Sequence, residues 1–318
     1  MDQTGKCTQT QKQRNQCNSG KNMPQDKSWR RWIIDTIIDD LFCTHEEADT
    51  RIFLHAEDMS KRGYTDVVIR SPDTDVEVIA IHFQQRISAR LTFVSGTKDK
   101  LRIVDVPALV NKLGSDVCAA LPGLHALTGC DSWSAFFGKG KKTALGVIQN
   151  DQEICKGLAL LGVSQTVSAS LHSSCEQFTI HLYGSTAADI NTARFELFCK
   201  KNLQSQSLPP TADALQKHVE RVNHQVYLWK QSLAPQPAIS SPIGKGWELC
   251  NNKLSIKWMT RSPAPISLME LVSCSCKTPC ATRRCSCQHA GLPCTPACKC
   301  GDHCINKAVQ STSDSEDE

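Results

Sequence analysis

The sequence lacks a long apolar run, a secretory signal and a strong net charge, and each absence narrows what the chain can be. No stretch approaches the roughly 18 consecutive apolar residues of a membrane-spanning helix, so we expect no such segment. The first 22 residues are polar throughout, without the apolar centre of a signal peptide. The net charge is +4, so a surface that attracts nucleic acid must be local.

Cysteine is what the chain has in abundance, with 18 copies. Without a secretory signal, so many thiols favour metal binding inside the cell over a framework of disulfides. Half of them form one run near the C-terminus, in which three C-x-C pairs alternate with single cysteines. The thiols of this run are those of Cys274, Cys276, Cys280, Cys285, Cys287, Cys294, Cys298, Cys300 and Cys304.

The number of these thiols predicts a zinc cluster. Zinc in structural sites takes four ligands in a tetrahedron. Nine thiolates satisfy three zinc ions if three of the thiolates bridge two ions each. The cluster then carries three negative charges, and five nearby cations more than offset them. These cations are Lys277, Arg283, Arg284, Lys299 and Lys307. We therefore expect three zinc ions and an anionic partner, with contact through Arg283 and Arg284 to phosphate or a narrow minor groove.

Helical and extended patterns alternate in the first half of the chain, which predicts an α/β fold with a parallel sheet. An amphipathic helix is expected over 45–63, followed by a strand at 66–70. The apolar stretch 76–83 is expected to be a second strand, and 91–96 and 101–106 are further strands. Two helices are expected to follow, ending near Gly129.

Composition divides the whole chain into six parts. The predicted divisions are a disordered start at 1–27, an α/β core at 28–150, a helical extension at 151–232, a linker with a hairpin at 233–270, a zinc–thiolate module at 271–307 and an acidic disordered tail at 308–318.

Five acidic residues stand where the predicted α/β pattern would bring them together. Glu47 and Asp49 begin the first helix, Asp73 and Asp75 follow a strand, and Asp131 follows a later helix. Ligands collect beyond the carboxyl ends of parallel strands. Each acid taken singly reads as a helix cap or turn residue. Together they predict a site for Mg²⁺ or Mn²⁺, which can activate water against a phosphodiester.

A basic, glycine-rich turn follows the last of these acids. It consists of Gly138, Lys139, Gly140, Lys141 and Lys142 and leads into the predicted helix TALGVIQN. Glycines let a phosphate approach the backbone closely. The helix start and the lysines attract the phosphate whatever the base sequence of the nucleic acid. A solvated helix start is the plainer alternative; beside the acids we favour nucleic-acid binding.

Three motifs in this half resemble the flap-endonuclease/XPG-type nucleases, a branch of the PIN-like nucleases. They are EAD at 47–49, SPDTD at 71–75 and LTGCDSWSAFFGKGKKTALGVI at 127–148. The resemblance covers residues 43–150. It implies a PIN-like parallel sheet flanked by helices, the five acids as metal ligands and a turn that holds the DNA backbone. Family members carry an Asp-bearing strand before these motifs that has no counterpart here, so the resemblance implies an incomplete core.

The cysteine run resembles the tesmin-type CXC module, a DNA-binding unit with three zinc ions. The segment CSCQHAGLPCTPACKC, with Cys304 and Asn306 after it, carries the resemblance. Arg284 stands where tesmin-type members place an aromatic residue before the middle C-x-C, and the chain has one copy of the module. A structural zinc knot that mediates protein contacts is the alternative to DNA contact.

The sequence thus predicts a nuclear, DNA-binding protein with a flap-endonuclease-like core that hydrolyses phosphodiesters with Mg²⁺ or Mn²⁺. Such a pairing of domains would suit a gene derived from a mobile element. The alternative is a non-catalytic DNA- or chromatin-binding scaffold that relies on the zinc module.

Overall fold

The computed structural model describes residues 41–131, 134–201, 205–262, 274–277, 279–294, 298–300 and 304–306. The predicted disordered start and acidic tail lie outside these ranges. The chain divides into two compact units. The first, which we call the core unit, contains the residues up to Phe178 and returns with Gln216–Lys257. The second contains Thr179–Leu215 and the residues from Trp258 onward, which include the cysteine run.

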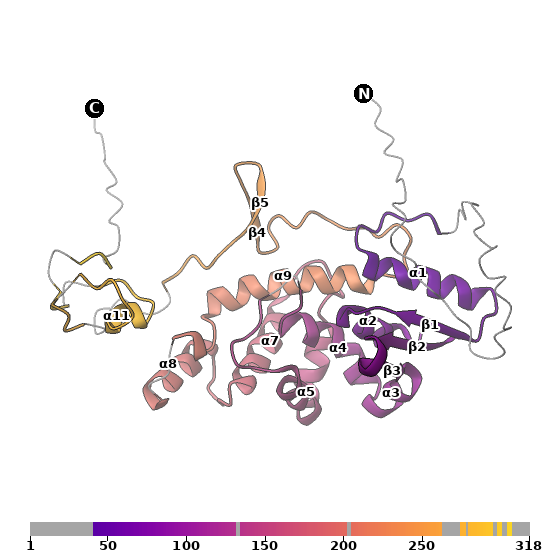
Figure 1. The fold of residues 1–318 in the computed structure, drawn as a ribbon, viewed down its shortest axis with the longest axis horizontal. Coiled ribbons are helices and arrows are strands. Elements are labelled where there is room, and N and C mark those ends of the chain that lie inside the picture. Colours follow the sequence, from indigo (N-terminus) through magenta and orange to yellow (C-terminus); the bar gives the residue numbers. More distant parts are fainter. Residues whose placement is uncertain are drawn as a thin grey trace. The chain divides into compact units, whose positions relative to one another are not determined.

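A small mixed sheet organises the core unit (Figure 1). Its strands are β1 (Asp66–Arg70), β2 (Arg90–Ser95) and β3 (Arg102–Asp105), in the order β1-β2-β3. β1 and β2 are parallel, as predicted, but β3 runs antiparallel to β2. A parallel return requires a crossover of a dozen residues or more. The connection at 96–101 is far shorter and holds only the 3-10 turn η3 (Lys98–Lys100), so β3 folds straight back.

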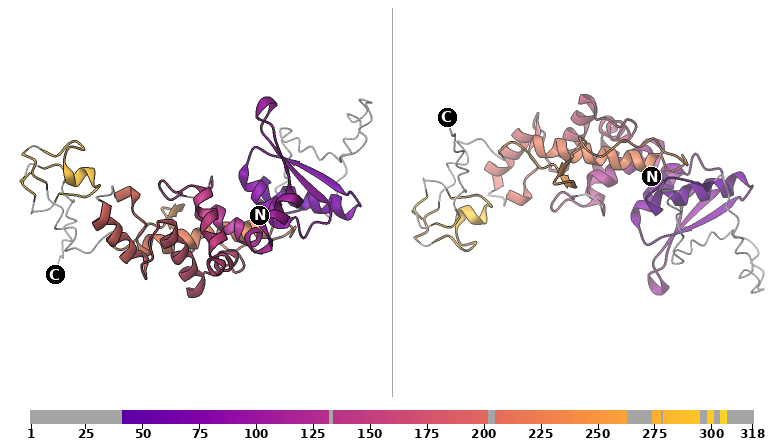
Figure 2. Two further views of the ribbon diagram at one scale, coloured as in Figure 1. Left: turned by 90° about the horizontal axis from the view of Figure 1, so that it is seen from below. Right: turned by 90° about the horizontal axis from the view of Figure 1, so that it is seen from above.

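Gly96 makes this tight return possible. Its φ is +75°, and a Cβ at this position would lie 2.1 Å from the backbone oxygen of Lys100. A residue with a side chain would therefore force the connection open. The connection stands out from the sheet as a loop (Figure 2, left).

Three helices pack against the sheet: α1 (Ala48–Lys61), α2 (Thr74–Phe83) and α3 (Val106–Leu113). A fourth, α4 (Ser115–Leu127), packs against α2 and α3. α1 contacts α2 and β1, whereas α2 contacts β2, α3 and α4. The interior is apolar, and Phe53, Phe83, Leu91 and Phe93 are at most 1% exposed.

Helix α2 corrects the predicted second strand at 76–83. Its N-cap Asp73 accepts a hydrogen bond from the backbone N–H of Asp75 at 2.8 Å, which starts a helix at Thr74. Val76, Ile79 and Phe83 are all buried. A short helix that is buried on nearly every side has the same continuous apolar run as a buried strand, so periodicity alone could not distinguish them.

The rest of the core unit is mainly helical, as predicted. It contains α5 (Lys141–Asn150), α6 (Gln152–Ala159), most of α7 (Ala169–Leu182) and most of α9 (Ala212–Lys230). The predicted apolar stripe of α9 is buried at Val219, Val222, Val226 and Trp229. The predicted hairpin is also present, as β4 (Trp247–Cys250) and β5 (Lys253–Ile256).

The second unit contains α8 (Ile190–Lys201), η4 (Ser205–Ser207) and α11 (Ser286–His289). Asp213 ties two of its segments together, since its Oδ2 accepts hydrogen bonds from the backbone N–H groups of Thr260 and Arg261, the latter at 2.9 Å. Among the described residues of both units, every helix is too short or too polar to cross a lipid bilayer.

Candidate metal sites

In residues 274–306, which we call the cysteine module, the buried side chains are mainly cysteine thiols. Eight of its nine cysteines are buried, and Cys276 packs against them. Without a metal, burial of a thiol stabilises a fold little more than burial of a small apolar side chain does. The arrangement therefore suits a segment whose interior is completed by metal ions.

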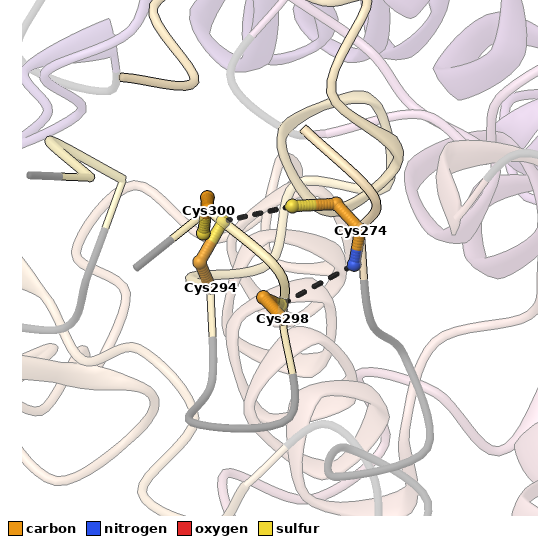
Figure 3. A group of neighbouring side chains, drawn as sticks. All are labelled: Cys274, Cys294, Cys298 and Cys300. Carbon is orange, nitrogen blue, oxygen red and sulfur yellow. Dashed lines mark hydrogen bonds between the residues drawn. The ribbon is translucent and has the colours of Figure 1, made fainter. Parts of the chain in front are cut away.

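The spacing of the sulfur atoms fits tetrahedral metal coordination. With metal–sulfur bonds of about 2.3 Å, the sulfurs of a tetrahedron lie about 3.8 Å apart. The Sγ of Cys274 lies 3.7 Å from that of Cys280 and 3.9 Å from that of Cys294, and Cys285 and Cys294 are 3.8 Å apart. Four cysteines of one group point toward one another (Figure 3).

Four groups of four cysteines have all their sulfur atoms within 4.8 Å of one another. These are Cys274–Cys294–Cys298–Cys300, Cys274–Cys276–Cys280–Cys285, Cys274–Cys285–Cys287–Cys294 and Cys280–Cys294–Cys300–Cys304. All nine predicted ligands take part. Cys274 and Cys294 each belong to three groups, and such overlap is what ions joined by bridging thiolates require. The module can thus hold several metal ions, plausibly zinc.

Backbone and amide groups fix the thiols in this arrangement. Burial raises the pKa of the Cys285 thiol, but hydrogen bonds from the backbone N–H of Gln288, neighbouring thiols and the N–H of Cys287 outweigh it and bring the pKa to about 6. Asn306 donates from Nδ2 to the Sγ of Cys294 at 3.4 Å, while its carbonyl accepts from the Cys294 N–H at 2.6 Å. Asn306 therefore closes the end of the module onto a shared ligand.

The surface of the module carries positive charge. Lys277, Arg283, Arg284 and Lys299 are all exposed, whereas Lys307 lies outside the described residues. The exposed positions leave these side chains in reach of an external anion.

The second candidate is the acidic group, by which we mean Glu47, Asp49, Asp73, Asp75 and Asp131. Glu47 is the N-cap of α1 and Asp49 lies in its first turn, whereas Asp73 caps α2 and Asp75 follows inside it. Asp131 lies in the turn after α4 and is exposed. The acids thus come from three separate segments of the core unit.

Folding gathers these acids around Asp49. Burial is the main effect that raises the pKa of Asp49 to about 6, and repulsion by Asp73, Glu47, Asp75 and Asp131 adds to it in that order. Burial also raises the pKa of Glu47, and Asp75 and Asp73 contribute repulsion there. The other four acids are therefore all near enough to Asp49 to act on its carboxyl electrostatically.

The acidic group is more open than the cysteine module. Within the described ranges, the sets of three or more ligand atoms that lie within 4.8 Å of one another all consist of cysteines. Like charges disfavour a closer approach of carboxylates when no cation lies between them. In this structure the acids are neighbours, but they are not a preformed shell for a single ion.

Two of the acids have polar partners that the sequence did not reveal. The Nε2 of His125 lies 2.7 Å from Oδ1 of Asp75, and both residues are buried. Gln225 of α9 donates from Nε2 to both carboxylate oxygens of Glu47, at 3.4 and 3.2 Å. Each partner is far away in the sequence. The one available signal for His125 was a single imidazole within the apolar helix 115–127.

The basic turn differs from its expected role at Lys141. Its Nζ donates to the carbonyls of His125 at 2.8 Å and Gly129 at 2.5 Å and to Oγ1 of Thr128 at 3.1 Å. The last carbonyls of a helix need donors from outside it, and Lys141 supplies them for α4. Its ammonium is therefore occupied within the chain, whereas Lys142 is exposed and Lys139 is half-buried. Gly138 has a φ of +68°, and Gly140 is the N-cap of α5.

Neither protein-family models, nor curated proteins, nor solved structures gave a match to this chain. The motifs that resemble flap-type nucleases and CXC modules therefore stand on their own residues. Activity and partners have to be inferred from the geometry of the acidic group and the cysteine module.

Proposed function

We propose that this chain is a nuclear, nucleic-acid-associated protein whose acidic group binds Mg²⁺ or Mn²⁺ and supports hydrolysis of DNA phosphodiesters. The observation that carries the proposal is the gathering of carboxylates from three separate segments around Asp49. Such a concentration of negative charge is costly for the folded protein unless a cation offsets it. Oxygen ligands favour Mg²⁺ and Mn²⁺ over softer ions.

The carboxylates have different parts in this proposal. Asp49 and Asp73 offer oxygens at the starts of two helices, and Asp75 is held by His125. Asp131 is exposed, so it lies where a substrate can approach. A divalent ion bound there would supply Lewis acidity toward water and the leaving oxygen.

The cysteine module supplies the proposed contact with nucleic acid. We propose three zinc ions, because the overlapping groups use all nine thiols and shared ligands satisfy three tetrahedra. Arg283 and Arg284 lie exposed beside the buried sulfurs, where they can pair with phosphates. In the core unit, Lys139, Lys142 and the glycines of the basic turn can add contacts with the backbone.

A second candidate function is a non-catalytic scaffold that binds DNA or chromatin through the zinc module. The observation in its favour is that Asp75, Glu47 and Lys141 are already satisfied by partners within the chain. A core whose charged groups stabilise each other does not require a substrate to explain them.

Cleavage by the zinc-loaded full chain tests the first proposal. Flap, bubble and single-stranded DNA are incubated with Mn²⁺, beside Asp73→Asn and Asp131→Asn. We expect loss of at least about 100-fold in rate for each variant, because electrostatic groups at reacting phosphates contribute at this scale. Asp99→Asn is the matched control, since Asp99 is exposed in η3 and outside the acidic group. Intact DNA with wild-type protein would favour the scaffold.

Salt dependence tests the contact with nucleic acid separately. The double variant Arg283→Ala with Arg284→Ala should lower the slope of log K against log salt by about two, because each phosphate contact contributes about one. Lys61→Ala, an exposed lysine at the end of α1, is the control and should leave the slope unchanged. Equal slopes for the double variant and the wild type would remove the module from the interface.

A further inference from the structure

A buried imidazole–carboxylate pair lies within the acidic group. His125 is 5% exposed and Asp75 is 6% exposed, and the Nε2–Oδ1 distance is 2.7 Å. A carboxylate that binds a cation is ionised and can only accept hydrogen bonds, so in that state Nε2 of His125 is the donor. The interaction joins α4 to the start of α2, across 50 residues of sequence.

His125 is itself held in place from several sides. Its carbonyl accepts a hydrogen bond from Nζ of Lys141, and its ring packs 6.1 Å from the ring of Trp229 on α9. Thr128, one turn later, donates from Oγ1 to the carbonyl of Leu124 at 2.7 Å and accepts from the same Lys141 ammonium. The end of α4 is therefore fixed, and the imidazole has little freedom to move away from Asp75.

This arrangement affects how Asp75 can bind a cation. Since Oδ1 already contacts the imidazole, Oδ2 is the oxygen of Asp75 better placed to bind a cation. A hydrogen bond to one oxygen of a ligating carboxylate fixes its orientation, and such partners affect metal affinity strongly.

We propose that His125 is a positioning residue for divalent-cation binding by the acidic group: it orients Asp75 so that one oxygen is presented to Mg²⁺ or Mn²⁺. The inference rests on the proposed function, since it concerns the same cation. The competing explanation is that the pair only ties α2 to α4 and contributes stability alone.

Binding of Mn²⁺, followed by electron paramagnetic resonance in the zinc-loaded full chain, tests the inference. His125→Phe keeps a planar ring but removes the donor, and we expect affinity for Mn²⁺ to fall by about 10- to 100-fold. His125→Gln places an amide donor near the position of Nε2 and should recover affinity to within about threefold of the wild type.

The matched control is His172→Phe on α7. The Nε2 of His172 meets no hydrogen-bond partner within the described part of the chain, so this variant should bind Mn²⁺ as the wild type does. Thermal unfolding of all variants is measured alongside. If His125→Phe and His125→Gln lose affinity equally, or lose only thermal stability, His125 has a structural role and the inference is wrong.

The two proposals fail in distinguishable ways. If Asp73→Asn weakens Mn²⁺ binding while His125→Phe does not, the inference is overturned and the cation site stands. If the wild type binds no Mn²⁺, both the proposed function and the inference are wrong.

Discussion

The core unit and the cysteine module achieve a buried interior by different means. In the core unit, aromatic and aliphatic side chains such as Phe53, Phe83 and Phe93 are removed from water, which is favourable without any added component. In the module the buried side chains are thiols. Burial is the main effect that raises the pKa of Cys280 and Cys294, and hydrogen bonds with neighbouring thiols add to it. A bound metal ion would offset this cost, because it holds cysteine as the thiolate.

The two candidate metal sites differ for the same reason. The sulfur ligands lie within one short segment, so the local chain can bring four of them within 4.8 Å of one another. The carboxylates come from segments placed by an apolar core that forms regardless of a cation. By this comparison, a metal ion in the module would be part of its folding, whereas a cation at the acidic group would bind to a fold that is held together by other residues.

Removal of zinc should have the largest effect on folding, and the resulting unfolding should be confined to the cysteine module. Structural zinc contributes about 10–16 kcal/mol in small zinc domains, so chelation should unfold residues 274–306. Limited proteolysis and amide hydrogen exchange should show this segment opening while β1, β2 and α2 stay protected. Simultaneous unfolding of the core unit would contradict the comparison.

Single cysteine variants sharpen this test. Cys274→Ser removes a ligand from three of the four groups, so it should release more zinc, measured by mass spectrometry, than Cys276→Ser, which affects one. Cys250→Ser is the matched control, because Cys250 is an exposed thiol at the end of β4. Its zinc content should equal that of the wild type.

The second prediction concerns the core unit. Phe83→Ala creates a cavity beside Phe53, whose ring centroid lies 6.0 Å away, and should lower the free energy of unfolding by about 3–5 kcal/mol. Urea denaturation measures this loss, and the zinc content should stay unchanged. Phe137→Ala, at a ring that is 56% exposed, should cost far less. Loss of zinc from Phe83→Ala would show that the two interiors are not independent.

The third prediction concerns the pH dependence caused by Asp49. Its pKa rises from 3.8 to about 6 on folding, so between these values the folded protein binds more protons than the unfolded chain. The free energy of unfolding should therefore fall as pH rises from about 4 to about 6. Because the carboxyl is only half-buried, solvent screening limits the effect to about 1 kcal/mol.

Asp49→Asn should remove this pH dependence and stabilise the protein near pH 7. Hydrogen exchange of amides in α2 and β1, without Mg²⁺ or Mn²⁺, follows the core unit alone. Asp99→Asn should keep the wild-type dependence. An unchanged slope in Asp49→Asn would mean that repulsion within the acidic group is too weak to require a cation.

Features that depend on local sequence were predictable. The nine thiols follow from their spacing, and α1, β1 and the hairpin of β4 and β5 follow from periodicity and turn residues. The grouping of the five acids was an expectation from strand ends and helix starts. What failed locally was α2, where an apolar run fitted two structures, and β3, where the short connection after Gly96 outweighed the expected crossover.

Features that depend on tertiary partners were not predictable. The pairing of His125 with Asp75 and of Gln225 with Glu47 joins residues far apart in sequence, and no local pattern indicates either partner. The same holds for Lys141, whose charge suggested a phosphate but whose ammonium satisfies the carbonyls at the end of α4.

The discontinuity of the core unit has a consequence for its synthesis. Its first part ends at Phe178, and most of α9 belongs to the second part, Gln216–Lys257. Until that part has been synthesised, Glu47, Leu127 and Gly162 lack their hydrogen-bond partners on α9. A ribosome adds about 5–20 residues per second, so the emerging amino-terminal part waits for seconds with apolar surface uncovered. Chaperones that shield nascent chains would have their main opportunity in that interval.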